Sequence, residues 1–179
     1  MSFKSPAADD AVSIRIENTE RAEERAAIRA AHEAAFGGCG EADLVDRLRQ
    51  TEHALISLVA VLEGRIVGHI LFSRMWIHNS AAPVPAVALA PVAVLPQHQR
   101  KGIGGLLIQH GLGCLRSLGE RIVIVVGHHD YYPRFGFSAD KARMLESPFP
   151  PEAFMAMELS AGALDGILGS VVYPPVFGI

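Results

Sequence analysis

Residues 92–105 read Val-Ala-Val-Leu-Pro-Gln-His-Gln-Arg-Lys-Gly-Ile-Gly-Gly, an apolar strand signal that passes through a short polar loop into closely spaced glycines and a helix. The first N–H groups of a helix have no partner within it, and with the helix dipole they favour an anion of linked phosphates. Gly102 and Gly104 lack a Cβ, so a ligand could approach the main chain there. Arg100 and Lys101 add positive charge. The stretch therefore predicts a loop that binds a pyrophosphate.

Two common phosphate-binding loops do not fit this spacing. The dinucleotide fingerprint needs a third glycine where this chain has Leu107, and the mononucleotide loop needs Gly-Lys-Ser/Thr, which is absent. The pattern that remains is Gln-x-x-Gly-x-Gly, from Gln99 to Gly104. It resembles the acyl-CoA loop of the GNAT superfamily of N-acetyltransferases. The alternative is a glycine-rich helix start without a ligand.

The resemblance implies a set of acetyl-CoA contacts in the strand and the loop. The strand would supply main-chain partners for the pantetheine arm, and the loop would hold the pyrophosphate. The implied residues are Val92, Ala93, Val94, Gln99, Arg100, Lys101, Gly102, Ile103, Gly104 and Gly105.

A second motif follows about thirty residues downstream. The β-branched run 121–126 is typical of a strand buried on both faces, and it leads into Gly-His-His-Asp-Tyr-Tyr-Pro-Arg-Phe-Gly-Phe at 127–137. Tyr132 and Gly136-Phe137 resemble the GNAT pattern Tyr-x-x-x-Gly-Phe, which places a tyrosine hydroxyl near the thioester sulfur. The resemblance implies that Tyr132 is the general acid. The alternative is that Tyr132 only packs beside its aromatic neighbours.

The periodicity of the chain predicts alternating strands and helices. We expect a strand at 12–16, helices at 19–36 and 41–49, antiparallel strands at 55–62 and 66–77, a strand at 87–95, a helix at 102–118, a strand from 122, and strands at 154–159 and 169–173. Glu63-Gly64 is the hairpin signal between the first antiparallel pair.

Pro91 conflicts with the strand at 87–95, because proline cannot donate a ladder hydrogen bond. A β-bulge would resolve the conflict. The resemblance implies such a bulge in the fourth strand, which splays from the fifth to open a notch for the pantetheine arm. The fold class it implies is an α/β, GNAT-like fold, with a central mixed, mostly antiparallel sheet, splayed fourth and fifth strands, and helices on both faces.

Length and composition place limits on the class of protein. The 179 residues, half of them apolar, fit a disordered tail at 1–11 and a single N-acetyltransferase domain at 12–179. The net charge of −3 and the lack of a basic cluster exclude nucleic acid as an expected partner. Four prolines interrupt the uncharged stretch 75–97, so we expect no membrane span.

Further expectations concern compartment and assembly. The N-terminus is unlike a signal peptide, and Cys39 and Cys114 form neither a disulfide framework nor a metal motif, so the prediction is a cytoplasmic protein without metal. The apolar content predicts a homodimer through the C-terminal strands.

The implied reaction is attack by an amine on a thioester, with main-chain N–H groups of 92–94 polarising the carbonyl. The general base is left open. Many GNAT members place a glutamate on the fourth strand, where this chain has Ala88, Ala90 and Ala93. Imidazole titrates near neutral pH. The candidates are His128, His129 and His69, more weakly Glu33 and Glu41, or a chain of water molecules.

The predicted function is transfer of an acetyl group from acetyl-CoA to a primary amine of a small molecule or peptide. Two alternatives remain. One is a catalytically silent module that binds acyl-CoA, and the other is an enzyme of the same fold that moves a longer acyl group or uses an acceptor other than an amine. The sequence does not identify the acceptor, because variable loops build that pocket.

Overall fold

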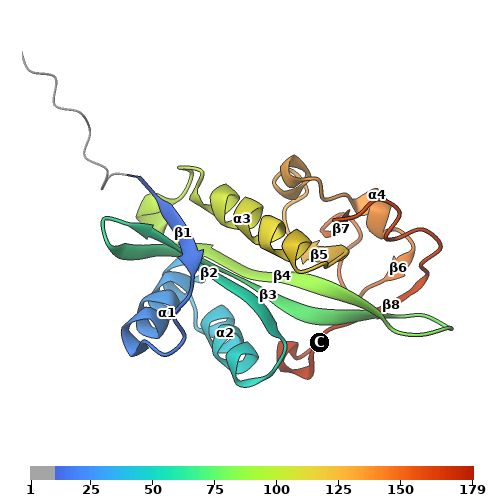
Figure 1. The fold of residues 1–179 in the computed structure, drawn as a ribbon, viewed down its shortest axis with the longest axis horizontal. Helices are drawn as coiled ribbons and strands as arrows, with labels where there is room; N and C mark the ends of the chain where they lie inside the picture. The colour runs from blue at the N-terminus through green and yellow to red at the C-terminus, as the bar shows by residue number, and fades with distance from the viewer. Residues whose placement is uncertain (1–10) are drawn as a thin grey trace, which may run out of the picture.

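The computed structural model describes residues 11–179, and Figure 1 shows them as one twisted sheet with helices on both faces. All but the last residue of the expected tail at 1–11 lies outside the described residues. The sheet order is β1-β2-β3-β4-β5-β7, and β8 pairs with both β3 and β6. The strands are β1 (Ser13–Ile16), β2 (Ala54–Leu62), β3 (Arg65–His78), β4 (Val84–Val94), β5 (Ile122–Val126), β6 (Leu145–Glu146), β7 (Phe154–Glu158) and β8 (Gly169–Val172).

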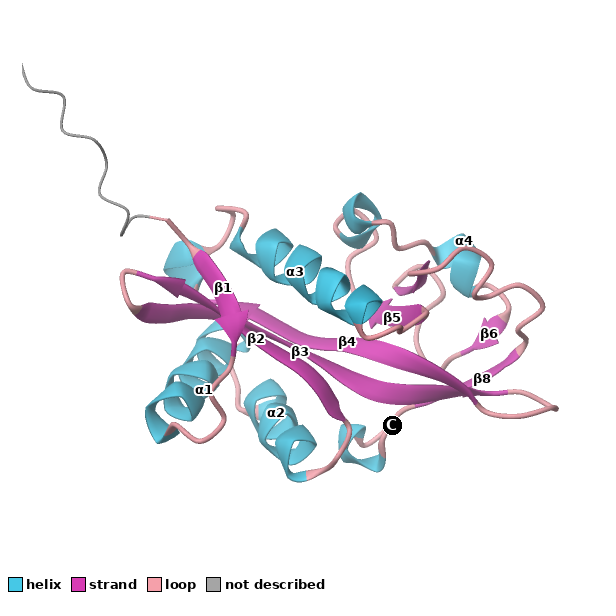
Figure 2. Cartoon of the chain, in the orientation of Figure 1, coloured by secondary structure: helices cyan, strands magenta, loops and turns pink. Residues whose placement is uncertain are grey.

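The helices lie in two layers (Figure 2). They are α1 (Ala22–Phe36), α2 (Gly40–Gln50), α3 (Ile103–Ser117) and α4 (Ala139–Ala142), with short 3-10 turns at Pro96–His98, Tyr132–Phe135 and Pro175–Phe177. Helices α1 and α2 cover one face of the sheet through a core cluster that contains Ile28, Leu48 and Leu71. Helix α3 covers the other face (Figure 1). The α/β fold class with helices on both faces is confirmed.

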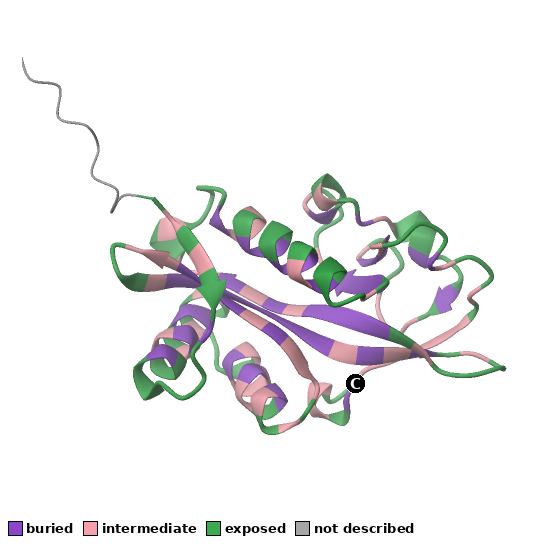
Figure 3. Ribbon diagram, in the orientation of Figure 1, coloured by how far each residue is buried: buried purple, intermediate pink, exposed green. Residues whose placement is uncertain are grey.

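The β2–β3 hairpin forms where the sequence predicts it. Glu63 and Gly64 both have positive φ, 49° and 74°, which is the backbone that a two-residue type I′ turn requires. The strands on either side pair antiparallel. Figure 3 shows that the middle strands of the sheet are largely buried, and Ile70, Leu71 and Phe72 of β3 are fully buried. The apolar run of β3 therefore forms the centre of the core.

Strand β4 contains the predicted bulge at Pro91. Val92 pairs with Ile70 and Leu89 pairs with Phe72, so β4 has one more residue than β3 between these pairs. Strand β5 is parallel to β4 but pairs with it only at Val87 and Ala88. Beyond Ala88, the edge of β4 therefore has no β5 partner. The splay of the fourth and fifth strands is confirmed.

The C-terminal third completes the sheet. The strands predicted at 154–159 and 169–173 are present as β7, which pairs antiparallel with β5, and β8, which pairs antiparallel with β3. The two-residue strand β6 and the short helix α4 are not among the predicted elements. Assembly through the C-terminal strands stays a prediction. Within residues 11–179, no helix is both long and apolar enough to span a bilayer.

Candidate active site

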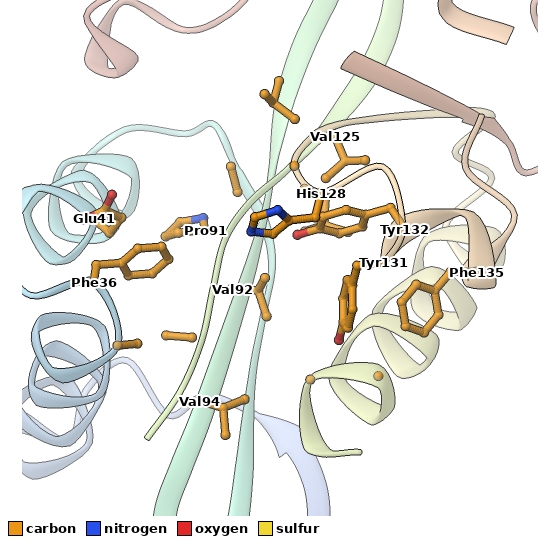
Figure 4. A pocket seen from close by; sticks show the side chains of 18 of the residues that line it. Phe36, Glu41, Pro91, Val92, Val94, Val125, His128, Tyr131, Tyr132 and Phe135 are labelled. Carbon is orange, nitrogen blue, oxygen red and sulfur yellow. The ribbon is translucent and has the colours of Figure 1, made fainter. Parts of the chain in front are cut away.

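A cavity of about 1250 Å³ lies at the carboxyl ends of β4 and β5 (Figure 4). The splayed strands form its centre, and the first turn of α3 and the segment after β5 form one side. The end of α1, the start of α2 and residues of the C-terminal segment form the other. The two sequence motifs therefore meet at one site, as parallel strands bring their carboxyl ends to the same edge of a sheet.

The open edge of β4 presents main-chain groups of alternate residues. The N–H of Leu95 donates to Val67 of β3 at 2.9 Å, whereas the Val94 carbonyl accepts a bond from the Gln99 side chain at 2.9 Å. Because successive residues of a strand point their main-chain groups to opposite edges, Val94 and Val92 face away from β3 and toward the notch. Both residues line the cavity. Their N–H groups are the donors that a thioester oxygen could meet.

Gln99 fastens the loop to the strand. Its side-chain amide donates to the Val94 carbonyl across five residues of the turn. This bond satisfies a carbonyl that the splay would otherwise leave without a β-partner. The glutamine of the motif therefore positions the loop, and the main chain that follows is left to meet a ligand.

At the first turn of α3, glycines leave the main chain open to a ligand. Gly102 precedes the helix with φ +85°, a conformation that residues with a Cβ rarely adopt. A Cβ at Gly104 would lie 2.9 Å from the Tyr131 hydroxyl. Arg100 lines the cavity, and Lys101 does not. Apart from Lys101, every predicted coenzyme-contact residue lines the cavity.

The two adjacent tyrosines reach different parts of the cavity (Figure 4). The Tyr131 hydroxyl lies near Gly104 at the start of α3. Tyr132 is 8% exposed and extends toward His128 at the centre of the notch. Its ring packs edge-to-face on Phe137 at 5.9 Å, and a Cβ at Gly127 would overlap it at 2.2 Å. The packing fixes the direction of the Tyr132 hydroxyl.

Burial changes the acidity of Tyr132. Removal from water disfavours phenolate, and the neighbouring Tyr131 adds to the effect, so the pKa of Tyr132 rises to about 12. Burial also raises the pKa of Tyr131. At neutral pH Tyr132 therefore carries its proton.

The three predicted histidines have different surroundings. His128 lines the cavity next to Tyr132 (Figure 4). His129 is not part of the lining, and its Nε2 lies 3.2 Å from Asp130. His69 is fully buried between the sheet and α1, away from the cavity lining. The interior position of His69 results from its place on β3 opposite Ala93, with its ring under α1. His69 therefore has no role in the reaction proposed below.

His69 belongs to a buried polar chain with a defined direction. The Ser57 hydroxyl donates to Glu17, so it accepts from His69 Nε2 at 2.8 Å. His69 Nδ1 is then an acceptor, and His32 Nε2 donates to it at 2.8 Å. Glu17 in turn pairs with Arg49 at 2.6 Å. This buried network links β2, β3 and the residue after β1 to helices α1 and α2, and both of its imidazoles are neutral.

Because of this buried network, we expect the folded protein to lose stability in acid. Burial lowers the pKa of His32 from 6.5 to about 3, and burial also lowers the pKa of His69. The unfolded chain then binds these protons first, so stability is full above pH 6.5 and falls as the pH decreases toward the folded pKa. His32 alone should cost about 2 kcal/mol between pH 8 and pH 5. Glu17, whose pKa is lowered to about 2, adds a further loss only below pH 4.5.

Urea unfolding at pH 8 and pH 5 measures this loss. We expect His32→Gln, which can keep a bond to His69, to reduce the difference between the two pH values by about 2 kcal/mol. His129→Gln changes an exposed histidine and is the control. An unchanged pH difference in His32→Gln would show that His32 does not carry the acid sensitivity.

The carboxylate candidates for the base also differ. Glu33 pairs with Arg29 at 2.9 Å and is not part of the lining. Glu41, in the first turn of α2, lines the cavity beside Phe36 and Pro91 (Figure 4). The structure thus brings Glu41 of α2 to the same cavity as His128 and Tyr132 of the segment after β5.

Several lining residues are absent from the sequence predictions. Arg134 lies over the Tyr131 ring, with its guanidinium carbon 4.4 Å from the ring centre. The others are mostly aromatic: Phe36, Leu44, Phe149, Tyr173 and Phe177. No local motif marks these five residues, because they come from α1, α2, the loop before β7 and the C-terminal segment.

Comparisons with known proteins agree with this geometry. The model of the Acetyltransferase (GNAT) family matches residues 22–137. The uncharacterized N-acetyltransferase YjhQ from Escherichia coli K12 is 43% identical over 130 residues, 70% of this chain and 72% of that protein. The GNAT family N-acetyltransferase YhbS from Escherichia coli, in complex with CoA, has a TM-score of 0.87 at 29% identity, covering 99% of this chain and 97% of that one. A GNAT family acetyltransferase from Brucella melitensis, in complex with acetyl-CoA, has a TM-score of 0.77 at 35% identity, covering 94% and 99%.

Proposed function

Because the chain belongs to the GNAT family of acetyltransferases and is an acyltransferase, we propose that it transfers an acetyl group from acetyl-CoA to a primary amine by direct attack. The acceptor is a small molecule or a peptide. The observation that carries the proposal is the cavity, in which the open edge of β4, the first turn of α3 and Tyr132 converge.

The cavity suits an acyl-CoA. The unpartnered N–H groups of the first turn of α3, with Arg100 close by, favour the pyrophosphate, and a Cβ at Gly104 would crowd the Tyr131 hydroxyl. Arg134 donates through Nε to the Tyr131 carbonyl at 3.2 Å, which leaves its terminal N–H groups for a phosphate oxygen. The pantetheine arm would run along Val92 and Val94 of β4.

In the proposed reaction the amine nitrogen bonds to the acetyl carbonyl carbon, and the bond from that carbon to sulfur breaks. The N–H groups of the open β4 edge stabilise the charge that develops on the carbonyl oxygen. Tyr132 donates its proton to the departing thiolate, and its phenolate takes the proton that the nitrogen loses as the amide forms. Desolvation raises the pKa of Tyr132, and it also raises the pKa of a thiol in the same cavity. Because both pKa values rise, Tyr132 can still donate its proton to the thiolate.

His128 is the proposed acceptor of the proton that the bound ammonium loses before its nitrogen attacks. It lines the cavity next to Tyr132 and carries a basic imidazole nitrogen, whereas His129 lies outside the lining. Glu41, across the notch from Tyr132, is proposed to hold the incoming amine. We expect His128→Gln to lower kcat with little change in CoA affinity, and His129→Gln to leave both unchanged.

Incubation with acetyl-CoA and a panel of amines tests the function, with thiol release and the mass of the product as readouts. Release of CoA together with an amine 42 mass units heavier, about the mass of an added acetyl group less a proton, is the expected result. A module that only binds acyl-CoA would show binding by calorimetry and no release. Faster release from a longer acyl-CoA would identify the other alternative.

A further inference from the structure

We propose that the acceptor is a monoamine whose amino group is carried on an apolar, preferably aromatic, body, and that Glu41 binds the ammonium. The inference rests on the proposed function and concerns the end of the cavity opposite α3. That end is built by the end of α1, the start of α2 and the C-terminal segment. Its composition differs from that of the coenzyme end.

An aromatic wall forms one side of this end. Phe149 packs edge-to-face on Tyr173 at 5.9 Å, and Tyr173 packs on Phe177 at 5.1 Å. All three line the cavity and are only partly buried, so they keep apolar surface free. Rings that pack against one another in this way offer a preformed surface for another ring.

Phe36 and Leu44 add apolar surface from α1 and α2 to the same end. Phe36 is 48% exposed, although it is a large apolar side chain at the end of α1 that lines the cavity. Its ring stacks on the buried His32 with an angle of 5° between the planes, which fixes its orientation. The acceptor end therefore has apolar surface from both helices and from the C-terminal segment, which an apolar ligand would cover.

Glu41 supplies the charge at this end. It is the one carboxylate side chain among the cavity-lining residues of the described chain, and within residues 11–179 no arginine, lysine or histidine pairs with it. The nearby acids Glu33, Asp43 and Asp46 are all paired with Arg29. Glu41 is thus available for one ammonium, as the neighbouring acids are not.

The charge pattern also excludes other amines. A second ammonium, as in a diamine, would find no second carboxylate side chain among the described residues that line the cavity. A carboxylate on the acceptor, as in a free amino acid, would meet Glu41 and no cation, because Arg100 and Arg134 belong to the coenzyme end. The site therefore fits one positive charge and an apolar body.

A comparison of four amines by the wild-type protein tests this inference, with kcat/KM for thiol release as the measure. The amines are 2-phenylethylamine, ethanolamine, 1,4-diaminobutane and phenylalanine. We expect 2-phenylethylamine to exceed ethanolamine by about 100-fold, because ring burial strengthens binding, and to exceed the diamine and the amino acid by a similar factor. Equal values, or a preference for the diamine or the amino acid, would overturn the inference and leave the proposed function intact.

Variants of the wall and of the carboxylate assign the residues. Tyr173→Ser should reduce the ratio between 2-phenylethylamine and ethanolamine at least about tenfold, and Tyr173→Phe should keep it. Glu41→Gln should raise KM for 2-phenylethylamine about tenfold or more, whereas Glu33→Gln should not. An unchanged KM in Glu41→Gln would overturn the role of Glu41. If no amine releases thiol although CoA binds, the proposed function fails instead.

Discussion

Tyr132→Phe is expected to lower kcat by about ten- to a thousand-fold while CoA affinity stays nearly unchanged. The substitution keeps the ring, which packs on Phe137 and is 8% exposed, so the cavity keeps its shape. Only the hydroxyl that would protonate the thiolate is lost. Steady-state kinetics with a good amine acceptor, together with calorimetric titration of CoA, separates the two quantities.

The neighbouring tyrosine provides a matched control. Tyr131→Phe removes a hydroxyl that lies beside Gly104, at the start of α3, so it should weaken CoA binding a few-fold and leave kcat nearly unchanged. Opposite effects from the two adjacent hydroxyls would assign binding to one and proton transfer to the other. Turnover of Tyr132→Phe at the wild-type rate would return Tyr132 to a packing role.

The pKa of Tyr132 adds a prediction for the same reaction. A phenol with an unperturbed pKa near 10 would lose its proton, and with it the acid function, as the pH passes 10. Because burial raises the pKa of Tyr132 to about 12, the proton is retained there. We expect kcat to show no descending limb between pH 8 and pH 10. A limb in that range that disappears in Tyr132→Phe would contradict the assigned state.

Gly104→Val is expected to weaken CoA binding by about 100-fold or more. Even a Cβ at this position would lie 2.9 Å from the Tyr131 hydroxyl, and the branched side chain would extend over the N–H groups at the start of α3. A side chain that covers these N–H groups prevents them from donating hydrogen bonds to a pyrophosphate. Arg100→Ala, which removes one exposed charge, should cost only about fivefold. Calorimetric titration with CoA measures both.

Variants of the two glycines that flank α3 distinguish an effect of backbone strain from an effect on CoA binding. Gly102 and Gly119 have φ of +85° and +78°, and a Cβ at either would meet nothing within 4 Å. Alanine at each position therefore introduces a similar backbone strain. Gly102→Ala should weaken CoA binding, and Gly119→Ala at the far end of the helix should only lower the melting temperature. Unchanged CoA affinity in both Gly104→Val and Gly102→Ala would remove the pyrophosphate assignment.

The sequence by itself determined those features of this protein that depend on residues next to one another along the chain. The glycine spacing at 102–104 marked the helix start, Glu63-Gly64 marked the hairpin, and Pro91 marked the bulge that opens β4. Each is a local backbone requirement, so residue type is enough to reveal it. The family followed from two such motifs in the right order.

Only the tertiary structure decided which side chains share the cavity. His69 and His128 are equivalent as residue types, yet packing under α1 buries the first and the end of β5 exposes the second. Glu33 and Glu41 are eight positions apart along the chain, and the ion pair with Arg29 occupies only the first. The acceptor end of the cavity contains residues more than a hundred positions apart along the chain, such as Phe36 and Tyr173. Contacts between distant segments depend on how the sheet brings those segments together, and no local pattern encodes them.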